Sequence, residues 1–333
     1  MGKNKDKTKE YKFIDLFAGI GGFRLALESL NLKCVYSSEW DKFAQQTYKN
    51  RFNELPDGDI TKVDEKKIPK HNIICAGFPC QAFSISGKQK GFEDTRGTLF
   101  FDIVRIAKHH NPEVLFLENV KNLTKHRNGE TLKIIEKTLD TLGYTAFHQV
   151  INASHYGVPA SRERIYFVCF RKDLNIKNFD FPKPTFENVK LSKILQKDKD
   201  TEKYIINRKD IKINEEKIKL KTSDIFGNNF LKPIRIGTIN NGGQGERIYS
   251  PEGHAITLSA YGGGAAGKTG AYLINGKVRK LSPRECARVM GFPDDFKLPE
   301  NSNQAYKQLG NSVVVPVLTL ISHKIIDTIN KNI

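Results

Sequence analysis

The first 142 residues alternate short apolar runs with longer segments of helical periodicity, and this alternation constrains the fold more than any other feature. In the longer segments apolar residues recur every three or four positions, whereas the short runs are too brief for helices. The alternation predicts βαβ units, an α/β fold with a parallel sheet whose ligands bind beyond the carboxyl ends of its strands. The predicted strands are residues 13–17, 33–37, 73–76 and 114–117, and the predicted helices are residues 21–30, 40–50, 98–109 and 130–142.

The character of the chain changes near residues 180–184. Residues 185–229 are rich in Lys, Ile, Asp and Asn and only weakly periodic, and residues 237–274 are glycine-rich with short β-prone runs such as 256–258 and 271–274. Residues 304–320 return to an apolar pattern of strand and helix. The expected units are a first domain of residues 1–190, a smaller β-rich domain of residues 191–282, and a returning segment of residues 283–333.

Positive charge is concentrated in the second half of the chain. The formal net charge is +17, and residues 171–280 carry 22 basic and 12 acidic residues. This excess favours a polyanionic partner such as nucleic acid, although a solvated lysine-rich surface would give the same count.

The five cysteines are widely spaced and include no CxxC pair. Neither a disulfide framework nor a metal site is expected, and a reducing cytoplasm fits best. No apolar run approaches the roughly 20 residues of a membrane helix, so no membrane segment is expected. The lysine-rich residues 1–12 are interpreted as a solvated tail.

A glycine turn follows the first predicted strand, in Asp15-Leu16-Phe17-Ala18-Gly19-Ile20-Gly21-Gly22-Phe23. Glycines let the backbone approach a nucleotide closely. Glu39 ends the next strand 20 residues after Gly19, which is the spacing of an acid that binds ribose hydroxyls. Asp59, at another expected strand end, is placed to bind an adenine amino group. The pattern favours a dinucleotide or S-adenosylmethionine, with a purely structural turn as the alternative.

Cys80 follows the third predicted strand, between Pro79 and Gln81. Proline stiffens this turn, and a thiol becomes an effective nucleophile only as a thiolate. Glu118 ends the fourth strand after four apolar residues, where burial should raise its pKa into the range of a proton donor. Cys80 and Glu118 can therefore meet in one pocket, although a core cysteine and an ion-paired acid are the plainer interpretations.

Two further features surround this pair. Arg162 and Arg164 alternate along an expected strand, so both can face a phosphate or a base carbonyl. The polar residues 82–98 contain three glycines and form a long connection that can act as a lid or simply be disordered.

In this order, the residues resemble the motifs of the DNA cytosine-5 methyltransferase family. Residues 15–24 are similar to its S-adenosylmethionine loop, Pro79-Cys80-Gln81 to its nucleophile motif, and Glu118-Asn119-Val120 to its acid motif. Arg162-Glu163-Arg164 resembles its arginine motif, but Ala160-Ser161 lacks the glutamine often found before it. Residues 281–286 and 308–313 resemble its closing motifs, so the likeness runs from about residue 11 to residue 320.

The resemblance implies a Rossmann-like, S-adenosylmethionine-dependent fold: a mixed, mostly parallel sheet with helices on both faces, plus a smaller β-rich target-recognition domain. It implies covalent attack on cytosine by Cys80, with Glu118 acting at N3, Arg164 at the base carbonyl and Arg162 ordering the site. The cofactor is S-adenosylmethionine, without a metal. The implied cofactor-binding residues are Phe17, Ala18, Gly19, Gly21, Gly22, Glu39, Trp40, Asp59, Ile60, Pro79, Leu99 and Asn311.

Residues 242–250 and 255–264 closely resemble the recognition segment of a family member that modifies the first cytosine of GCGC, whereas residues 251–254 and 265–267 differ. The cytosine must leave the helix to reach the pocket. Further implications are a monomer that acts on double-stranded DNA at the nucleoid of a bacterial cytoplasm, paired with a restriction endonuclease. The implied DNA-binding residues are Ser84, Ser86, Lys88, Gln244, Arg247, Tyr249, Thr257, Tyr261, Gly263 and Gly264.

Other functions remain open on the sequence alone. The same chemistry can act at another short site or on RNA, and the same fold can bind DNA without turnover. A dehydrogenase would account for the glycine turn but not for Cys80, Glu118 and Arg164 together. An amino-group methyltransferase would need an Asp/Asn-Pro-Pro-aromatic motif, which the sequence lacks.

Overall fold

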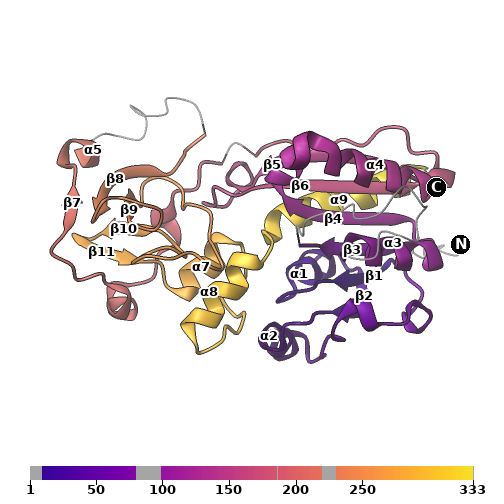
Figure 1. The fold of residues 1–333 in the computed structure, drawn as a ribbon, viewed down its shortest axis with the longest axis horizontal. Helices are drawn as coiled ribbons and strands as arrows, with labels where there is room; N and C mark the ends of the chain where they lie inside the picture. The colour runs from indigo at the N-terminus through magenta and orange to yellow at the C-terminus, as the bar shows by residue number, and fades with distance from the viewer. Residues whose placement is uncertain (1–9, 80–98, 186, 220–229, 333) are drawn as a thin grey trace, which may run out of the picture.

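The computed structural model describes residues 10–79, 99–185, 187–219 and 230–332, and these residues contain two sheets (Figure 1). The larger sheet has the strand order β2-β1-β3-β4-β6-β5. Strands β1 to β4 pair in parallel, and β6 runs antiparallel to both β4 and β5. The strands are β1 (Lys12–Leu16), β2 (Lys33–Ser38), β3 (Ile73–Gly77), β4 (Val114–Val120), β5 (Tyr144–Asn152) and β6 (Glu163–Arg171).

Helices cover both faces of this sheet because successive strand residues point to opposite sides. Phe13 and Phe116 belong to a buried cluster with α1 (Gly22–Glu28) and α9 (Val315–Asn332). Their neighbours Ile14 and Leu115 belong to a second cluster, with α3 (Leu99–His110) and α4 (Glu130–Thr141). Helix α2 (Lys42–Phe52) follows β2 and begins at Asp41, whose carboxylate accepts hydrogen bonds from the N–H groups of Phe43 and Ala44.

The smaller sheet has the order β11-β10-β9-β8-β7 and a buried cluster of its own. Its pairs are antiparallel except for β9 and β10. Its elements are β7 (Ile211–Ile213), the short helix α5 (Glu215–Lys219), β8 (Ile234–Ile239), β9 (Arg247–Ser250), β10 (Ala271–Ile274) and β11 (Lys277–Lys280). Short 3-10 turns complete the described chain: η1 (Ile60–Lys62), η2 (Glu65–Lys67), η4 (Lys121–Gly129), η5 (Ala153–His155), η6 (Lys172–Leu174), η7 (Leu191–Ile194), η8 (Asp198–Asp200) and η9 (Glu202–Tyr204).

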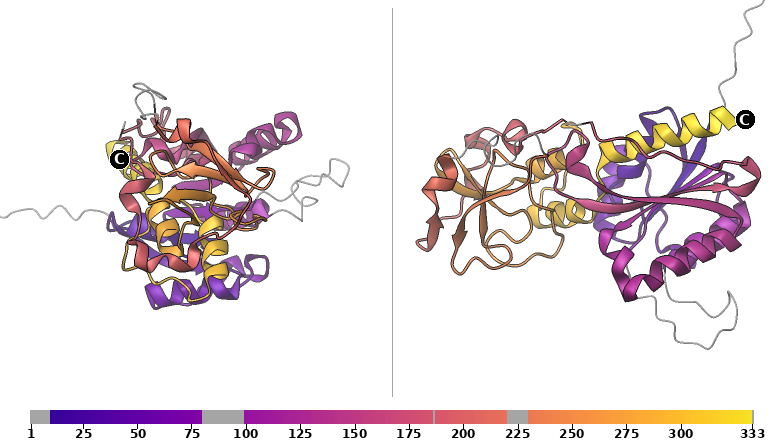
Figure 2. Two further views of the ribbon diagram at one scale, coloured as in Figure 1. Left: turned by 90° about the vertical axis from the view of Figure 1, so that its left-hand side faces the viewer. Right: turned by 90° about the horizontal axis from the view of Figure 1, so that it is seen from above.

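The C-terminal helices connect the two sheets. Helices α7 (Pro283–Val289) and α8 (Ser302–Asn311) lie between the sheets, and α9 runs back along the larger one (Figures 1 and 2). Helix α9 packs on α1, and the Tyr11 hydroxyl donates to Asn330 Oδ1 at 2.9 Å. By length and composition the stretch Ser302–Asn332 could cross a membrane, but 56% of its apolar window is buried, as in a core helix.

The strands and helices predicted for the first half of the chain are confirmed within a few residues, as is the mostly parallel sheet. Three expectations were wrong. Residues 304–320 form parts of two helices and no strand, and residues 256–258 have no strand structure, with only an isolated bridge at Ala255. Asp59 caps the 3-10 turn η1 instead of ending a strand. The domain boundaries at residues 190 and 282 stay predictions.

Candidate active site

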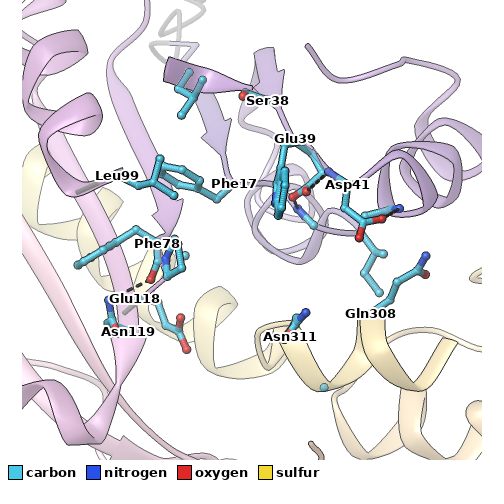
Figure 3. Close-up of a pocket in the computed structure, with 18 of the residues that line it drawn as sticks. Phe17, Ser38, Glu39, Asp41, Phe78, Leu99, Glu118, Asn119, Gln308 and Asn311 are labelled. Carbon is cyan, nitrogen blue, oxygen red and sulfur yellow. Dashed lines mark hydrogen bonds between the residues drawn. The ribbon is translucent and has the colours of Figure 1, made fainter. Parts of the chain in front are cut away.

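A cavity of about 640 Å³ lies at the carboxyl ends of β1 to β4 (Figure 3). Five stretches of chain build its wall: residues 17–20, 38–44, 58–61, 77–79 and 118–120. Leu99, Arg162, Arg164 and Tyr261 add single side chains, and residues 307–311 of α8 close the remaining side. The cavity therefore lies at the edge of the sheet where the sequence predicted ligand binding.

Nine of the twelve predicted cofactor-binding residues line this cavity. They are Phe17, Gly19, Glu39, Trp40, Asp59, Ile60, Pro79, Leu99 and Asn311. The other three, Ala18, Gly21 and Gly22, do not line it. A Cβ atom added to Gly21 would meet the Phe52 ring, and one added to Gly22 would meet Val313. These two glycines therefore allow close packing of the turn on the protein interior.

Glu39 and Gly19 lie together on one side of the cavity. The two carboxylate oxygens of buried Glu39 accept hydrogen bonds from the N–H groups of Gly19 and Asp41, each at 2.8 Å. Burial raises the pKa of Glu39, and these hydrogen bonds oppose that rise. Gly19 has φ of +56°, and a Cβ there would meet nothing within 4 Å. The fixed carboxylate and the open glycine suit a ligand that has hydroxyl donors and approaches the backbone.

Two more residues shape this side of the cavity. The Trp40 side chain is 77% exposed, which leaves its ring available to a flat ligand. Asp59 accepts hydrogen bonds from the N–H and the hydroxyl of Thr61, at 3.1 and 2.8 Å, and these bonds lower its pKa. Its carboxylate is therefore held as an acceptor at neutral pH.

Glu118 and Arg164 form an ion pair on the opposite side of the cavity. Glu118 lies in β4 and is only 7% exposed, and its Oε1 lies 3.0 Å from Nε of Arg164 in β6. Burial raises the pKa of Glu118, while the positive charges of Arg164 and Arg162 oppose that rise. A carboxyl group with a raised pKa at a cavity wall can hold or deliver a proton near neutral pH.

Asn119 holds the turn that leads into the nucleophile motif. Its Nδ2 donates to the Phe78 carbonyl oxygen at 2.9 Å, and Asn119 is 2% exposed. Phe78 precedes Pro79, so this bond ties the end of β3 to β4 (Figure 3).

Four predicted site residues lie outside the described residues: Cys80, Ser84, Ser86 and Lys88.

Arg162 differs from Arg164 in its surroundings. It precedes β6, is 3% exposed and donates hydrogen bonds to the carbonyl oxygens of Leu258, Gly310 and Ser312. Burial lowers the pKa of Arg162 to about 9, and the charge of Arg164 acts in the same direction. The sequence pattern treated the two arginines alike, but only Arg164 is paired with Glu118.

Four of the predicted DNA-binding residues lie on or beside two glycine-rich turns that contact each other. Ala266 N–H donates to the Gly245 carbonyl at 3.0 Å, and an added Cβ at Gly245 would lie 2.3 Å from the Gly263 oxygen. Gln244, Arg247, Gly263 and Gly264 are exposed there. The two turns therefore present one joint surface.

The other three recognition residues lie elsewhere. Thr257 is exposed and its hydroxyl donates to the Ser161 carbonyl, and Tyr261 is exposed at the cavity. Tyr249 is buried against Tyr272, with ring centroids 5.9 Å apart, so its ring does not face solvent.

Sequence reasoning missed the side chains that join α8 to α2 beside the cavity. Lys307 Nζ lies 2.7 Å from Asp41 Oδ2, and the Thr47 hydroxyl lies 3.0 Å from Gln308 Oε1. Asp41, Lys307 and Gln308 line the cavity. Gln308 begins a segment that resembles a closing motif, whereas the signal for Lys307 was helical spacing, since residues 307 and 311 share one face of a helix.

Comparisons with known proteins match the chain to one family. The family model described as C-5 cytosine-specific DNA methylase matches residues 11–327. The chain is 57% identical over 319 residues to Type II methyltransferase M.HhaI of Haemophilus parahaemolyticus, spanning 96% of this chain and 95% of that protein. It is 43% identical over 333 residues to Type II methyltransferase M.HpaII of Haemophilus parainfluenzae, spanning 97% and 91% of the two chains.

Among solved structures, the S. pombe Dnmt2 methyltransferase aligns with a TM-score of 0.72 over 97% of this chain and 100% of that chain. At 18% sequence identity, this match supports a shared fold and nothing further. The matches confirm the predicted S-adenosylmethionine-dependent methyltransferase fold and the predicted enzyme class, DNA (cytosine-5-)-methyltransferase. The chain belongs to the C-5 cytosine-specific DNA methylase family.

Proposed function

We propose that this enzyme methylates carbon 5 of cytosine in double-stranded DNA, at the first cytosine of GCGC, with S-adenosylmethionine as the methyl donor. One observation carries the proposal: Glu118 and Arg164 face the same cavity as Glu39 and the open Gly19. An acid–arginine pair and a nucleoside-type site thus share one space. The 57% identity to M.HhaI, whose recognition segment residues 242–250 and 255–264 resemble, supports the choice of GCGC.

The cofactor side fits S-adenosylmethionine by its donors and acceptors. Glu39 holds its carboxylate toward ribose hydroxyls, and Asp59 accepts from the adenine amino group. The exposed Trp40 ring and the apolar Phe17, Ile60 and Leu99 contact the purine, while Gly19, Pro79 and Asn311 border the rest of the ligand. When bound, the cofactor supplies an electrophilic methyl group.

The chemistry begins with a covalent bond from Cys80 to C6 of the flipped cytosine. Carbon 5 of cytosine is too electron-poor to be methylated directly, and nucleophilic addition divides the hard step into easier ones. As the thiolate adds, Glu118 holds or delivers a proton at N3, so electron density moves onto carbon 5. After methylation, N3 returns its proton to Glu118, carbon 5 loses its proton to water, and the C6–sulfur bond breaks to release Cys80 as a thiolate.

Arg164 serves both the base and the acid in this scheme. It donates to the cytosine carbonyl and moderates the rise in the Glu118 pKa. Flipping costs a few kcal/mol of lost stacking and pairing. Ser86 and Gln244 fill the space that the cytosine leaves, with Ser84 and Lys88 beside Ser86.

Target recognition rests on the exposed joint surface of the two glycine-rich turns. Arg247 reads a guanine edge by paired hydrogen bonds, a contact worth about 1–3 kcal/mol of discrimination. Gly263, Gly264, Thr257 and Tyr261 border the duplex, and Tyr249 supports the surface from below. We assign residues 1–190 to catalysis, residues 191–282 to target recognition and residues 283–333 to the hinge and returning segment.

The cellular setting follows from the same proposal. The enzyme acts as a monomer at the nucleoid of a bacterial cytoplasm and protects DNA from a cognate restriction endonuclease. Support comes from the net charge of +17 and from relatives named Type II methyltransferases.

The test is base-resolution mapping of 5-methylcytosine in unmethylated plasmid after incubation with the protein and S-adenosylmethionine. Modification confined to the first cytosine of GCGC is the expected result. Modification at another short site would keep Cys80 and Glu118 in their roles and refute the assignments of Gln244 and Arg247. Absence of modification, with intact cofactor binding, would favour RNA as the substrate or binding without turnover.

A further inference from the structure

Arg162 joins three parts of the chain that are far apart in sequence. Its Nη2 donates to the carbonyl oxygens of Gly310 at 3.1 Å and Ser312 at 2.6 Å, and its Nη1 donates to the Leu258 carbonyl at 3.4 Å. Charge-assisted hydrogen bonds are the stronger kind. The guanidinium therefore fixes these carbonyls relative to one another.

Two of the three carbonyls flank a cavity residue. Gly310 and Ser312 stand on either side of Asn311, which is exposed and lines the cavity proposed for the cofactor (Figure 3). Holding both neighbours fixes the backbone of Asn311. A shift of the Arg162 guanidinium would consequently move the backbone of Asn311 at the cofactor side of the site.

The third carbonyl belongs to the segment that carries recognition residues. Residues 255–258 run beside residues 159–162: Ala255 N–H donates to Pro159 O at 2.8 Å, and Ser161 N–H donates to Ala255 O at 3.0 Å. The Thr257 hydroxyl adds a bond to the Ser161 carbonyl. The recognition segment is thus attached to the residues that lead directly into Arg162 and Arg164.

The end of α8 also touches the recognition segment directly. A Cβ atom on Gly310 would lie only 2.4 Å from the backbone nitrogen of Ala260, so only glycine fits without displacement. Residues 259 and 260 are followed by Tyr261, which is exposed at the cavity. A movement of the recognition segment must therefore displace either α8 or the bonds of Arg162.

We propose that Arg162 is a positioning residue that couples engagement of the target duplex to occupancy of the cofactor cavity. The inference rests on the proposed function, because it takes DNA and S-adenosylmethionine as the two ligands. When the target sequence binds, residues 255–260 become fixed. The hydrogen bonds of Arg162 then restrict the backbone around Asn311. Linkage is reciprocal, so the cofactor strengthens binding of the target by the same factor.

The experiment measures S-adenosylhomocysteine affinity for the free protein and for its complex with a duplex containing the mapped methylation site. In the wild type we expect the duplex to tighten S-adenosylhomocysteine by about tenfold, within the usual range of coupling between sites. Arg162→Lys keeps the charge but cannot hold three carbonyls in a fork, so the ratio should fall to within about threefold of one. Arg171→Lys, at the far end of β6, is the matched control and should keep the wild-type ratio.

If Arg162 had only a structural role, Arg162→Lys would lower the melting temperature or weaken S-adenosylhomocysteine binding equally in the free protein and in the complex. The ratio of the two affinities would not change. A wild-type ratio in Arg162→Lys, or a ratio of one in a wild type that methylates DNA, would overturn the coupling and leave the proposed function intact. If Arg162→Lys does not fold, Gly310→Ala decides, since it separates α8 from Ala260 and leaves Arg162 in place. A reduced ratio in Gly310→Ala supports the coupling, and an unchanged ratio refutes it.

Discussion

Arg164 Nε lies 3.0 Å from Glu118 Oε1, because the antiparallel register of β4 and β6 places Arg164 opposite Val120, two residues beyond Glu118. Strand alternation then directs both side chains to the same face. Burial favours the protonated carboxyl of Glu118, and the arginine limits how far the pKa rises. The pair thus favours the protonated acid more than an exposed carboxyl would, with the arginine as a counterweight.

Glu118→Gln should lower the methylation rate by about 10²–10⁴-fold, the usual contribution of a general acid. The wild-type rate should fall as pH rises through the raised pKa of Glu118, since the deprotonated carboxylate has no proton to deliver. In Glu118→Gln this fall at high pH should vanish, while the rise that reports formation of the Cys80 thiolate remains. Single-turnover rates across pH 5.5 to 9 would check this, and a variant with the wild-type rate and profile would refute the role.

Cys80→Ser should abolish methylation and leave DNA affinity within about threefold of wild type, because the thiolate acts on the base and not in recognition. A duplex with 5-fluorocytosine at the target gives a direct readout. Its carbon 5 cannot lose a proton after methylation, so the wild type should remain covalently attached in denaturing gels, whereas Cys80→Ser should not. Methylation by Cys80→Ser at the wild-type rate would exclude the covalent mechanism.

Arg247→Ala should reduce discrimination between the target site and sites with one guanine replaced by roughly 5- to 150-fold, the factor equivalent to about 1–3 kcal/mol. The reason is that exposed Arg247 projects from β9 beside the turn at Gly242, at the joint surface. Competition between the two duplexes in one reaction would measure the ratio. Lys277→Ala removes an exposed charge from β11 and serves as the control: it should weaken all duplexes equally. An unchanged sequence preference in Arg247→Ala would refute the contact.

His254→Leu should flatten the loss of stability at acidic pH. His254 is fully buried, and burial, aided by the charge of His155, lowers its pKa to about 4 from 6.5. Between these two values the unfolded chain binds the proton more strongly, so stability is complete above pH 6.5 and is lost as pH falls toward 4. From pH 7 to pH 5 this histidine should cost about 2 kcal/mol of unfolding free energy.

Urea unfolding of the wild type and His254→Leu at pH 7 and pH 5 would measure that difference. His71 and His155, whose pKa values burial likewise lowers, remain in both proteins and contribute to the residual slope. Equal losses in wild type and His254→Leu would contradict the assignment to His254.

The larger sheet could largely be predicted because the patterns that specify its strands lie within short stretches of sequence. Strands β1, β3 and β4 are short apolar runs whose two faces are both covered by helices, and such runs stand out whatever the rest of the chain does. Glu39 and Glu118 could be placed at one edge from topology alone. The 3-10 cap at Asp59 was missed because capping depends on a hydrogen bond to Thr61 that no periodicity reveals.

The C-terminal part was less predictable because its conformation depends on distant contacts. The apolar residues of α9 satisfy strand and helix patterns equally, and packing on α1 selects the helix. Residues 256–258 are β-prone, yet they bond to residues 160–162 and form no ladder. The positions of Lys307 and Gln308 opposite Asp41 and Thr47 required the complete fold.

The closing of the cavity by α8 has a consequence for protein synthesis. Strands β1 to β4 leave the ribosome early, whereas residues 307–311 emerge only after both sheets, ahead of α9, which packs on α1 and reaches Tyr11. A nascent chain that ends before α8 has Glu39 and Glu118 but no complete wall between them. Translation through α8 is therefore needed to complete the wall of the cavity, and a polypeptide terminated before α8 is expected to lack methylation activity even though its central sheet is present.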